Sequence, residues 1–159
     1  IGSGKTTLAK QLATELKIPH YELDNIVWER HPDGDKKRSI TARNALLEKT
    51  IQKEAWIIEG AHHTWIAPSI EKADLIIFLD TKLTTRKRRI LTRFIKQKLN
   101  IEPANYQPTL KTLRFLYQYN TIFENEAKPE ILTLLEPYKE KVKWIQTPKE
   151  LRTLIKPDT

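Results

Sequence analysis

Four short apolar runs alternate with longer amphipathic stretches along this chain. The runs extend from Ile18 to Leu23, from Ala55 to Ile58, from Ala73 to Leu79 and from Val142 to Ile145. The third run is apolar at successive positions, which is typical of a strand covered by helices on both faces. Strands that alternate with helices predict an α/β protein with a parallel sheet.

Helix boundaries are marked by capping residues in the stretches between these runs. An amphipathic pattern begins at Lys5 and continues to Leu16, and Ser39 can cap a helix that ends before Trp56. Thr147 opens a capping box, with proline at the first helical position. These signals predict helices before the first run, between the first two runs and after the last.

The segment 101–141 interrupts the alternation, because two helical patterns follow one another there without a strand between them. Pro137 removes a backbone donor and disfavours helical geometry at Glu136, so we expect the second helix to stop or bend near Leu135. We predict one domain over residues 1–159, with a helical lid region at about 82–141.

Composition narrows the class of protein. The chain has 159 residues, 39% of them hydrophobic, which suits one globular domain with an ordinary core. It has no run of about 18 apolar residues and no cysteine, so we expect a cytoplasmic protein without membrane contact. The net charge of +8 favours anionic ligands, which include nucleotides and nucleic acids.

The opening residues carry the most specific motif. Gly2 to Thr7 read Gly-Ser-Gly-Lys-Thr-Thr, the second half of the phosphate-binding pattern G-x-x-x-x-G-K-[ST]. The complete pattern would place its first glycine two residues before Ile1, and a buried strand before that. We therefore expect this chain to begin inside the motif and to lack the first strand of its sheet.

A helix that starts at this loop strengthens the nucleotide interpretation. Glycines let consecutive backbone N–H groups point at one anion, and the helix directs its positive end to the same place. Lys5 would neutralise the outer phosphates of ATP, and the Thr6 hydroxyl would ligate Mg²⁺. We assign Gly2, Ser3, Gly4, Lys5, Thr6 and Thr7 to cofactor binding, although Thr7 also suits a helix start. The alternative is an ordinary glycine-rich turn.

Acidic residues follow two of the apolar runs. Asp24 and Glu59 come where two strands are expected to end, and ligands of parallel sheets bind at that edge. Oxygen ligands are what Mg²⁺ requires, so both are candidates, with Glu59 as the metal ligand. Asp24 would act as a base or would position the acceptor, or it would simply close an Asx turn.

Arginines cluster after the third run. Arg86, Arg89 and Arg93 have the spacing of one helix face, and we expect the apolar residues to lie toward the opposite side. Planar guanidinium groups bind phosphate oxygens in pairs and stabilise a phosphoryl group in transfer. We assign Arg89 and Arg93 to catalysis and Arg86 to nucleotide binding; the alternative is a solvated polar face.

Residues for the acceptor are predicted in two places. Arg38 and Arg43 lie between the first two runs, and Gly60 and His62 follow Glu59 directly. Adjacent histidines on a strand point to opposite faces, and no cysteine or carboxylate spacing completes a zinc set. We therefore expect an acceptor contact at His62 and no zinc site.

These motifs in this order resemble the nucleoside and nucleotide kinases of the P-loop class. The segments Leu23 to Arg30 and Glu59 to Trp65 are similar to those of bacterial DNA topology modulation proteins, also called FlaR-related, which look like adenylate kinase. The resemblance implies a three-layer P-loop NTPase fold with strand order 2-3-1-4-5. It also implies that Lys5 and Thr6 lie in the ATP site, that Arg89 and Arg93 belong to a lid, and that Thr147 and Pro148 approach the adenine.

Two hypotheses of function follow. The first is a phosphotransferase that uses ATP and Mg²⁺ to phosphorylate a nucleotide or small-molecule acceptor. The second is a nucleotide-dependent regulator of DNA topology that binds nucleic acid. Its support is a segment in which the basic residues Lys111 and Arg114 lie close in sequence to Phe115, Tyr117 and Tyr119, since basic and aromatic residues together can bind phosphates and stack on bases. The helical spacing of most of these aromatic residues favours core packing, and no helix-turn-helix or zinc-finger pattern is present in the sequence, so the first hypothesis is preferred.

Overall fold

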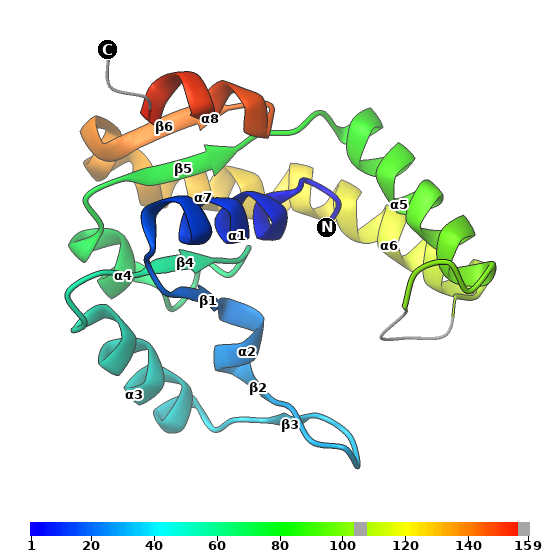
Figure 1. Ribbon diagram of the computed structural model, residues 1–159, viewed down its shortest axis with the longest axis horizontal. Helices are drawn as coiled ribbons and strands as arrows, with labels where there is room; N and C mark the ends of the chain where they lie inside the picture. Colours follow the sequence, from blue (N-terminus) through cyan, green and yellow to red (C-terminus); the bar gives the residue numbers. More distant parts are fainter. Residues whose placement is uncertain (104–107, 156–159) are drawn as a thin grey trace. The chain divides into compact units, whose positions relative to one another are not determined.

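The computed structural model describes residues 1–103 and 108–155, and it confirms a mixed α/β protein. The described chain divides into two compact units. Figure 1 shows the helices and strands, coloured along the sequence. Unit 1 comprises residues 1–4, 77–133 and those from Trp144 onward, and unit 2 comprises residues 5–76 and 134–143. Each unit is described separately below.

Unit 2 is built on a pair of short parallel strands. Strand β1 pairs with β4 in a register that sets His20 opposite Ile57 and Glu22 opposite Glu59. Strands β2 and β3 form a small antiparallel hairpin. The elements of this unit are α1 (Lys5–Leu16), β1 (His20–Glu22), α2 (Leu23–Val27), β2 (Trp28–Glu29), β3 (Lys36–Lys37), α3 (Ile40–Ile51), β4 (Ile57–Glu59) and α4 (Ala67–Lys72).

A hydrophobic core packs one face of this strand pair. Leu23 and Ile26 of α2 are buried with Leu47 and Ile51 of α3, and Ile58 of β4 packs against them. In Figure 1, α1 lies on one side of the β1–β4 pair and α3 on the other. Because side chains alternate along a strand, the neighbours of Ile58 on β4 point to the α1 side. This alternation positions Glu59 beside the start of α1.

Unit 1 contains the long helices and most of a second strand pair, formed by β5 and β6. In Figure 1, α5 and α6 run side by side. The remaining elements, some of which cross the unit border, are β5 (Ile76–Leu79), α5 (Leu83–Lys98), α6 (Leu110–Ile122), a π-helical turn (Phe123–Ala127), α7 (Lys128–Leu135), a 3₁₀ segment (Glu136–Lys141), β6 (Val142–Ile145) and α8 (Pro148–Ile155).

Most predicted elements are confirmed, with shorter bounds for three of the four strands. Ser39 caps α3 through a hydrogen bond that its hydroxyl accepts from the Ala42 N–H at 3.2 Å. At α8, Thr147 donates to the carboxylate of Glu150, as a capping box requires. The predicted stop near Leu135 is also found, because the helix passes there into a 3₁₀ segment that contains Pro137.

The two helices predicted within 101–141 follow one another as α6 and α7. They are joined by the π-helical turn Phe123–Ala127, which the sequence pattern did not indicate. Residues 104–107 of the predicted lid region lie outside the described residues. Among the helices that are described, none is long and apolar enough to cross a bilayer.

Candidate functional site

The glycines of the opening loop have a conformation that other residues avoid. Gly2 has φ +77° and Gly4 has φ +96°, both in the left-handed region. A Cβ atom at Gly2 would lie 3.0 Å from the carbonyl oxygen of Arg86, so a side chain would also crowd the backbone of α5. The loop before α1 therefore depends on glycine at these positions for its shape.

Side chains of unit 1 hold the backbone of this loop. Arg89 donates from Nη1 to the carbonyl oxygens of Gly2 and Ser3, at 3.2 and 2.6 Å. The Thr81 hydroxyl lies 3.1 Å from the carbonyl oxygens of both Ser3 and Gln146. Thr81 is buried and was not among the predicted site residues, although its place two residues after the end of β5 could have indicated it.

Arg86 was predicted to bind the nucleotide, but its side chain is engaged within the protein. Its side chain is buried, its guanidinium group donates to Glu124, and it lies 5.2 Å from the centre of the Phe123 ring. Arg93 is paired with Glu102 at 3.3 Å. The three arginine side chains therefore have three different partners, and of these side chains it is that of Arg89 that bonds to the loop.

The predicted division of α5 into an arginine face and an apolar face is wrong. The buried side of the helix carries Arg86 together with Ile90 and Phe94, whereas Leu91 and Ile95 are exposed. A carboxylate partner makes this burial possible, since a charged side chain enters the interior only when it is paired. Spacing alone did not show that Glu124 would supply that partner.

Two more predicted residues, Thr147 and Pro148, come directly after Gln146 at the start of α8. The N–H and the hydroxyl of Thr147 donate to the carboxylate of Glu150. The N–H of Gln146 donates to the same carboxylate. These bonds, above all the one from Gln146, lower the pKa of Glu150. A Cβ at Gly4 would lie 3.9 Å from Pro148 Cγ, so within unit 1 Pro148 borders the loop.

In unit 2, the first residues of α1 meet the end of β4. The Thr6 hydroxyl donates to Glu59 Oε1 at 2.7 Å, and Lys5 Nζ lies 3.6 Å from Glu59 Oε2. The Glu59 side chain is only 9% exposed, and its Oε2 has no hydrogen-bond partner among the described residues. Thr7 is exposed on α1. Three predicted residues, Lys5, Thr6 and Glu59, are thus in contact.

Asp24 lies beside this group, in the first turn of α2 rather than in the Asx turn weighed as an alternative. Its Oδ1 lies 3.0 Å from His62 Nε2. That hydrogen bond lowers the pKa of Asp24 from its ordinary value of 3.8, helped by the positive charges of Lys5 and Arg30 and opposed by burial. A carboxylate that stays ionised next to an imidazole can accept or relay a proton.

The other predicted acceptor residues have structural partners. Arg38 donates to the carbonyl oxygen of Asn25 at 2.8 Å, and the Arg43 guanidinium stacks 4.3 Å from the centre of the Trp65 ring. A Cβ at Gly60 would lie 2.6 Å from Cβ of Leu23, so glycine is needed there for close packing against α2.

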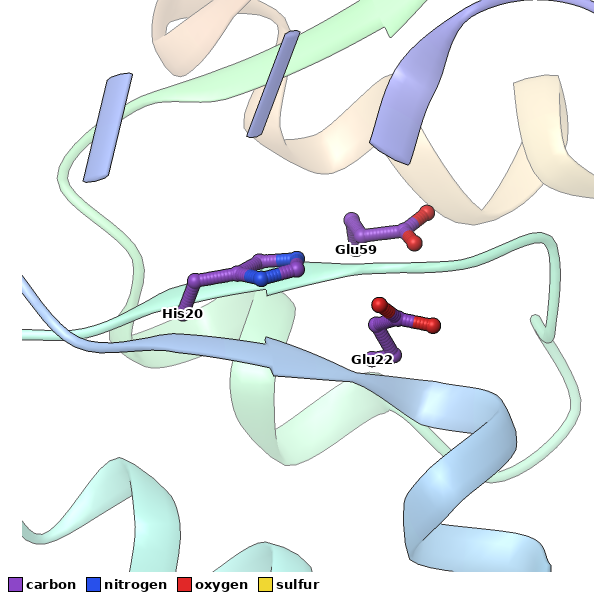
Figure 2. Close-up of side chains that lie close together, drawn as sticks. All are labelled: His20, Glu22 and Glu59. Carbon is purple, nitrogen blue, oxygen red and sulfur yellow. The ribbon is translucent and has the colours of Figure 1, made fainter. Parts of the chain in front are cut away.

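Two residues that the sequence analysis did not select lie next to Glu59. His20 and Glu22 on β1 share a face with Glu59, and Figure 2 shows the three side chains grouped together. The available signal was the pattern of two polar residues, two positions apart, within a predicted strand. That pattern places both side chains on one face.

Comparison of the sequence with models of known protein families found no match, and comparison with curated proteins also found no significant relative.

Proposed function

We propose that this chain acts as a cytoplasmic ATP-dependent phosphotransferase, which requires Mg²⁺ and transfers the γ-phosphate to a nucleotide or small-molecule acceptor. One observation carries the proposal: directly after two left-handed glycines, Lys5 and Thr6 at the start of α1 share the largely buried carboxylate of Glu59. An ammonium group, a hydroxyl and a carboxylate beside a helix N-terminus are the groups that a magnesium nucleotide needs.

The residues fit ATP and Mg²⁺ by their chemistry. The first backbone N–H groups of α1 have no partner within the helix, and its first turn contains no acidic residue that would repel phosphate. Thr6 and Glu59 offer the oxygen ligands that hold Mg²⁺, and Lys5 offers a positive charge for the outer phosphates. Bound ATP would supply the phosphoryl group.

Each remaining role belongs to one side chain. Arg89 donates to the carbonyl oxygens of Gly2 and Ser3, and we assign to it the role of holding the loop in shape. Asp24 would accept the proton of the acceptor hydroxyl, and its hydrogen bond with His62 keeps its carboxylate ionised and oriented. Arg86 has no place in this scheme, because Glu124 already binds it.

The strand pairs also support the proposal. In the order 2-3-1-4-5, the second strand neighbours the third and the fourth neighbours the fifth. With the small β2–β3 hairpin left out and β1, β4, β5 and β6 numbered as strands 2 to 5 of that order, the observed pairs β1–β4 and β5–β6 match these two neighbours. The three-layer P-loop architecture is therefore part of the proposal.

Calorimetry and an acceptor panel test the proposal. We expect the purified protein to bind ATP with Mg²⁺ and to phosphorylate one class among nucleosides, nucleotides and small metabolites. Lys5→Ala should reduce transfer by about a hundredfold or more, since it removes charge stabilisation from the transition state. Lys49→Ala, on the exposed side of α3, is the matched control. Absence of ATP binding by the unmodified protein would refute the assignment.

One observation, a group of exposed aromatic and basic side chains on α6, supports the nucleic-acid hypothesis. Phe115 and Tyr119 on α6 are 59% and 41% exposed, so core packing does not account for these two of the aromatic residues. Their ring centres lie 6.4 Å apart, and Lys111 and Arg114 are exposed on the same helix. Exposed aromatic rings among basic residues can stack on bases and contact phosphates.

A salt titration of DNA binding discriminates this second function from the first. If α6 binds nucleic acid, affinity should fall steeply with salt, and Arg114→Ala should reduce that salt dependence. Phe115→Ala should weaken binding to single strands by about 1 to 3 kcal/mol, the range found for a base stacked on an aromatic ring. Binding that is unchanged by both substitutions would exclude this surface.

A further inference from the structure

Three potential metal ligands converge on one face of the β1–β4 pair. His20 and Glu22 lie two positions apart on β1, and Glu22 stands opposite Glu59 in the parallel register. One ligand atom from each side chain lies within 4.8 Å of the other two, and Figure 2 shows their grouping. The strand pairing itself therefore brings one imidazole and two carboxylates together.

The carboxylates of Glu22 and Glu59 face each other and repel each other electrostatically. Like charges directly opposite each other on paired strands are destabilising unless a cation lies between them. The cations nearby are ammonium groups: Lys10 Nζ is 3.5 Å from Glu22 Oε1, and Lys5 Nζ is 3.6 Å from Glu59 Oε2. Both distances exceed the roughly 2.7 to 2.9 Å of a strong charge-assisted hydrogen bond, so neither lysine satisfies its carboxylate closely.

Unsatisfied atoms at the cluster provide an independent indication. His20 Nε2 and Glu59 Oε2 are both shielded from solvent, and neither has a hydrogen-bond partner among the described residues. A buried polar atom without a partner costs free energy, so native proteins rarely keep one without a reason. A single cation would satisfy a nitrogen lone pair and a carboxylate oxygen together.

We propose that His20, Glu22 and Glu59 bind a divalent transition-metal ion, of which Zn²⁺ is the best fit. Imidazole nitrogen suits zinc better than magnesium, and two carboxylates balance the charge of the ion. Three protein ligands are typical of a zinc site that leaves a position open for water or substrate. The site shares Glu59 with the proposed Mg²⁺ site, but it holds its ion without any nucleotide, so zinc binding can be tested without phosphotransferase activity.

Zinc binding would draw the three side chains closer together. Ligand atoms around a tetrahedral Zn²⁺ at about 2.0 to 2.2 Å lie about 3.3 to 3.6 Å apart. The three ligand atoms here lie within 4.8 Å of one another, and rotation of the side chains would supply the remaining approach. Binding would also displace Lys5 from Glu59, which would free its ammonium group for another anion.

Calorimetric titration with Zn²⁺, in the presence of excess Mg²⁺ and without nucleotide, tests the site. The purified protein should bind one ion per chain. His20→Gln and Glu22→Gln should each weaken binding by about tenfold or more, because even indirect supports of a metal ligand contribute that much. The matched controls His31→Gln and Glu29→Gln, on exposed residues of the same unit, should stay close to the unmodified protein. Equal affinities in all four variants would overturn the proposal.

Two further measurements keep the test independent of folding and of ATP binding. X-ray absorption at the zinc edge of the unmodified protein should show one imidazole and otherwise oxygen ligands, and two or more imidazoles would contradict the assignment. Lys10→Gln should tighten zinc binding by up to about fivefold, because it removes a competing ion pair of the exposed kind. If Lys10→Gln weakens zinc binding instead, Glu22 is not a ligand.

Discussion

The two units each contain a group of four charged side chains, and the groups differ in how tightly they are paired. In unit 1, Lys128 donates to Asp80 at 2.7 Å and to Glu124 at 3.4 Å, and Glu124 also accepts from the buried Arg86. In unit 2, the two lysine contacts of Glu59 and Glu22 are at 3.5 Å or more. The charges of the first group are joined to one another by hydrogen bonds, although Arg86 Nε has no partner among the described residues, and we call this group closed. The charges of the second group are joined only by the longer lysine contacts, although Glu59 also accepts a hydrogen bond from Thr6, and we call this group open.

This difference separates a structural role from a binding role. A closed network stabilises the fold, because every charge in it has a partner whose loss would leave another charge buried. An open cluster contributes little to folding but can exchange its weak ion pairs for a ligand. The closed network of unit 1 joins α5 to the π-helical turn, whereas the open cluster of unit 2 lies at the start of α1.

The largest expected effect is on stability in unit 1. Glu124→Gln removes the carboxylate that pairs with Arg86, whose side chain is 4% exposed. We expect a loss of about 3 kcal/mol in the free energy of unfolding, the lower end of the range for breaking a buried pair, because Glu124 keeps some exposure. Denaturant unfolding measures this loss. The control Glu126→Gln, on an exposed neighbour, should change stability by no more than about 0.5 kcal/mol.

For Glu59 in unit 2, we expect a small effect on stability and a large effect on activity. Glu59→Gln removes a negative charge that faces Glu22, so the free energy of unfolding should change by less than about 1 kcal/mol. Phosphoryl transfer should nevertheless fall about a hundredfold, since a proposed metal ligand is lost. Parallel unfolding and activity assays measure both quantities. A large loss of stability would place Glu59 in the same structural class as Glu124.

A smaller effect on stability is expected from the titration of Lys128 at alkaline pH. Burial lowers the pKa of Lys128, but its hydrogen bond to Asp80 and the charges of Asp80 and Glu124 outweigh this, so the pKa lies above its ordinary 10.5. Its contribution to stability is complete below pH 10.5 and is lost as the pH rises through the folded-state pKa. Thermal unfolding above pH 10 should show this loss in the unmodified protein and less of it in Lys128→Gln. Lys139→Gln, on an exposed lysine, is the control.

The smallest effect on stability is expected from the titration of Asp24, in unit 2, at acidic pH. Hydrogen bonding to His62 keeps the pKa of Asp24 below 3.8, so its contribution is complete above that value and is lost as the pH falls through the folded-state pKa. Because Asp24 is largely exposed, no more than about 1 kcal/mol should be lost. Asp24→Asn should flatten the acid limb of the stability curve. An unchanged acid limb would show that the hydrogen bond has little effect in solution.

The sequence predicted the elements of the fold well because their signals are local. Ser39 and Thr147 mark helix starts by chemistry that acts within one turn, and Pro137 marks a stop in the same way. The π-helical turn could not be predicted, because it has no comparable residue signal. Within the turn, Glu124 pairs with Arg86 of α5, a contact between residues far apart in the sequence.

The candidate site was predicted only in part, for a related reason. Lys5, Thr6 and Glu59 followed from a loop motif and from the rule that parallel strands present ligands at their ends. The side chains of His20 and Glu22 join them only through the register of β1 against β4, which a single sequence does not reveal. Arg86 shows the converse: a motif position became structural because a distant carboxylate neutralised it.

The π-helical turn also limits how this chain can change length. A π turn holds one more residue than an α turn, so deleting one residue within Phe123–Ala127 would restore ordinary helical winding and leave the direction of α7 nearly unchanged. Deleting one residue from α6 instead would rotate everything after it by about 100° relative to the residues before it. Lys128 would then turn away from Asp80 and Glu124 from Arg86. Single-residue deletions should therefore be tolerated within the π-helical turn and not in the helix that precedes it.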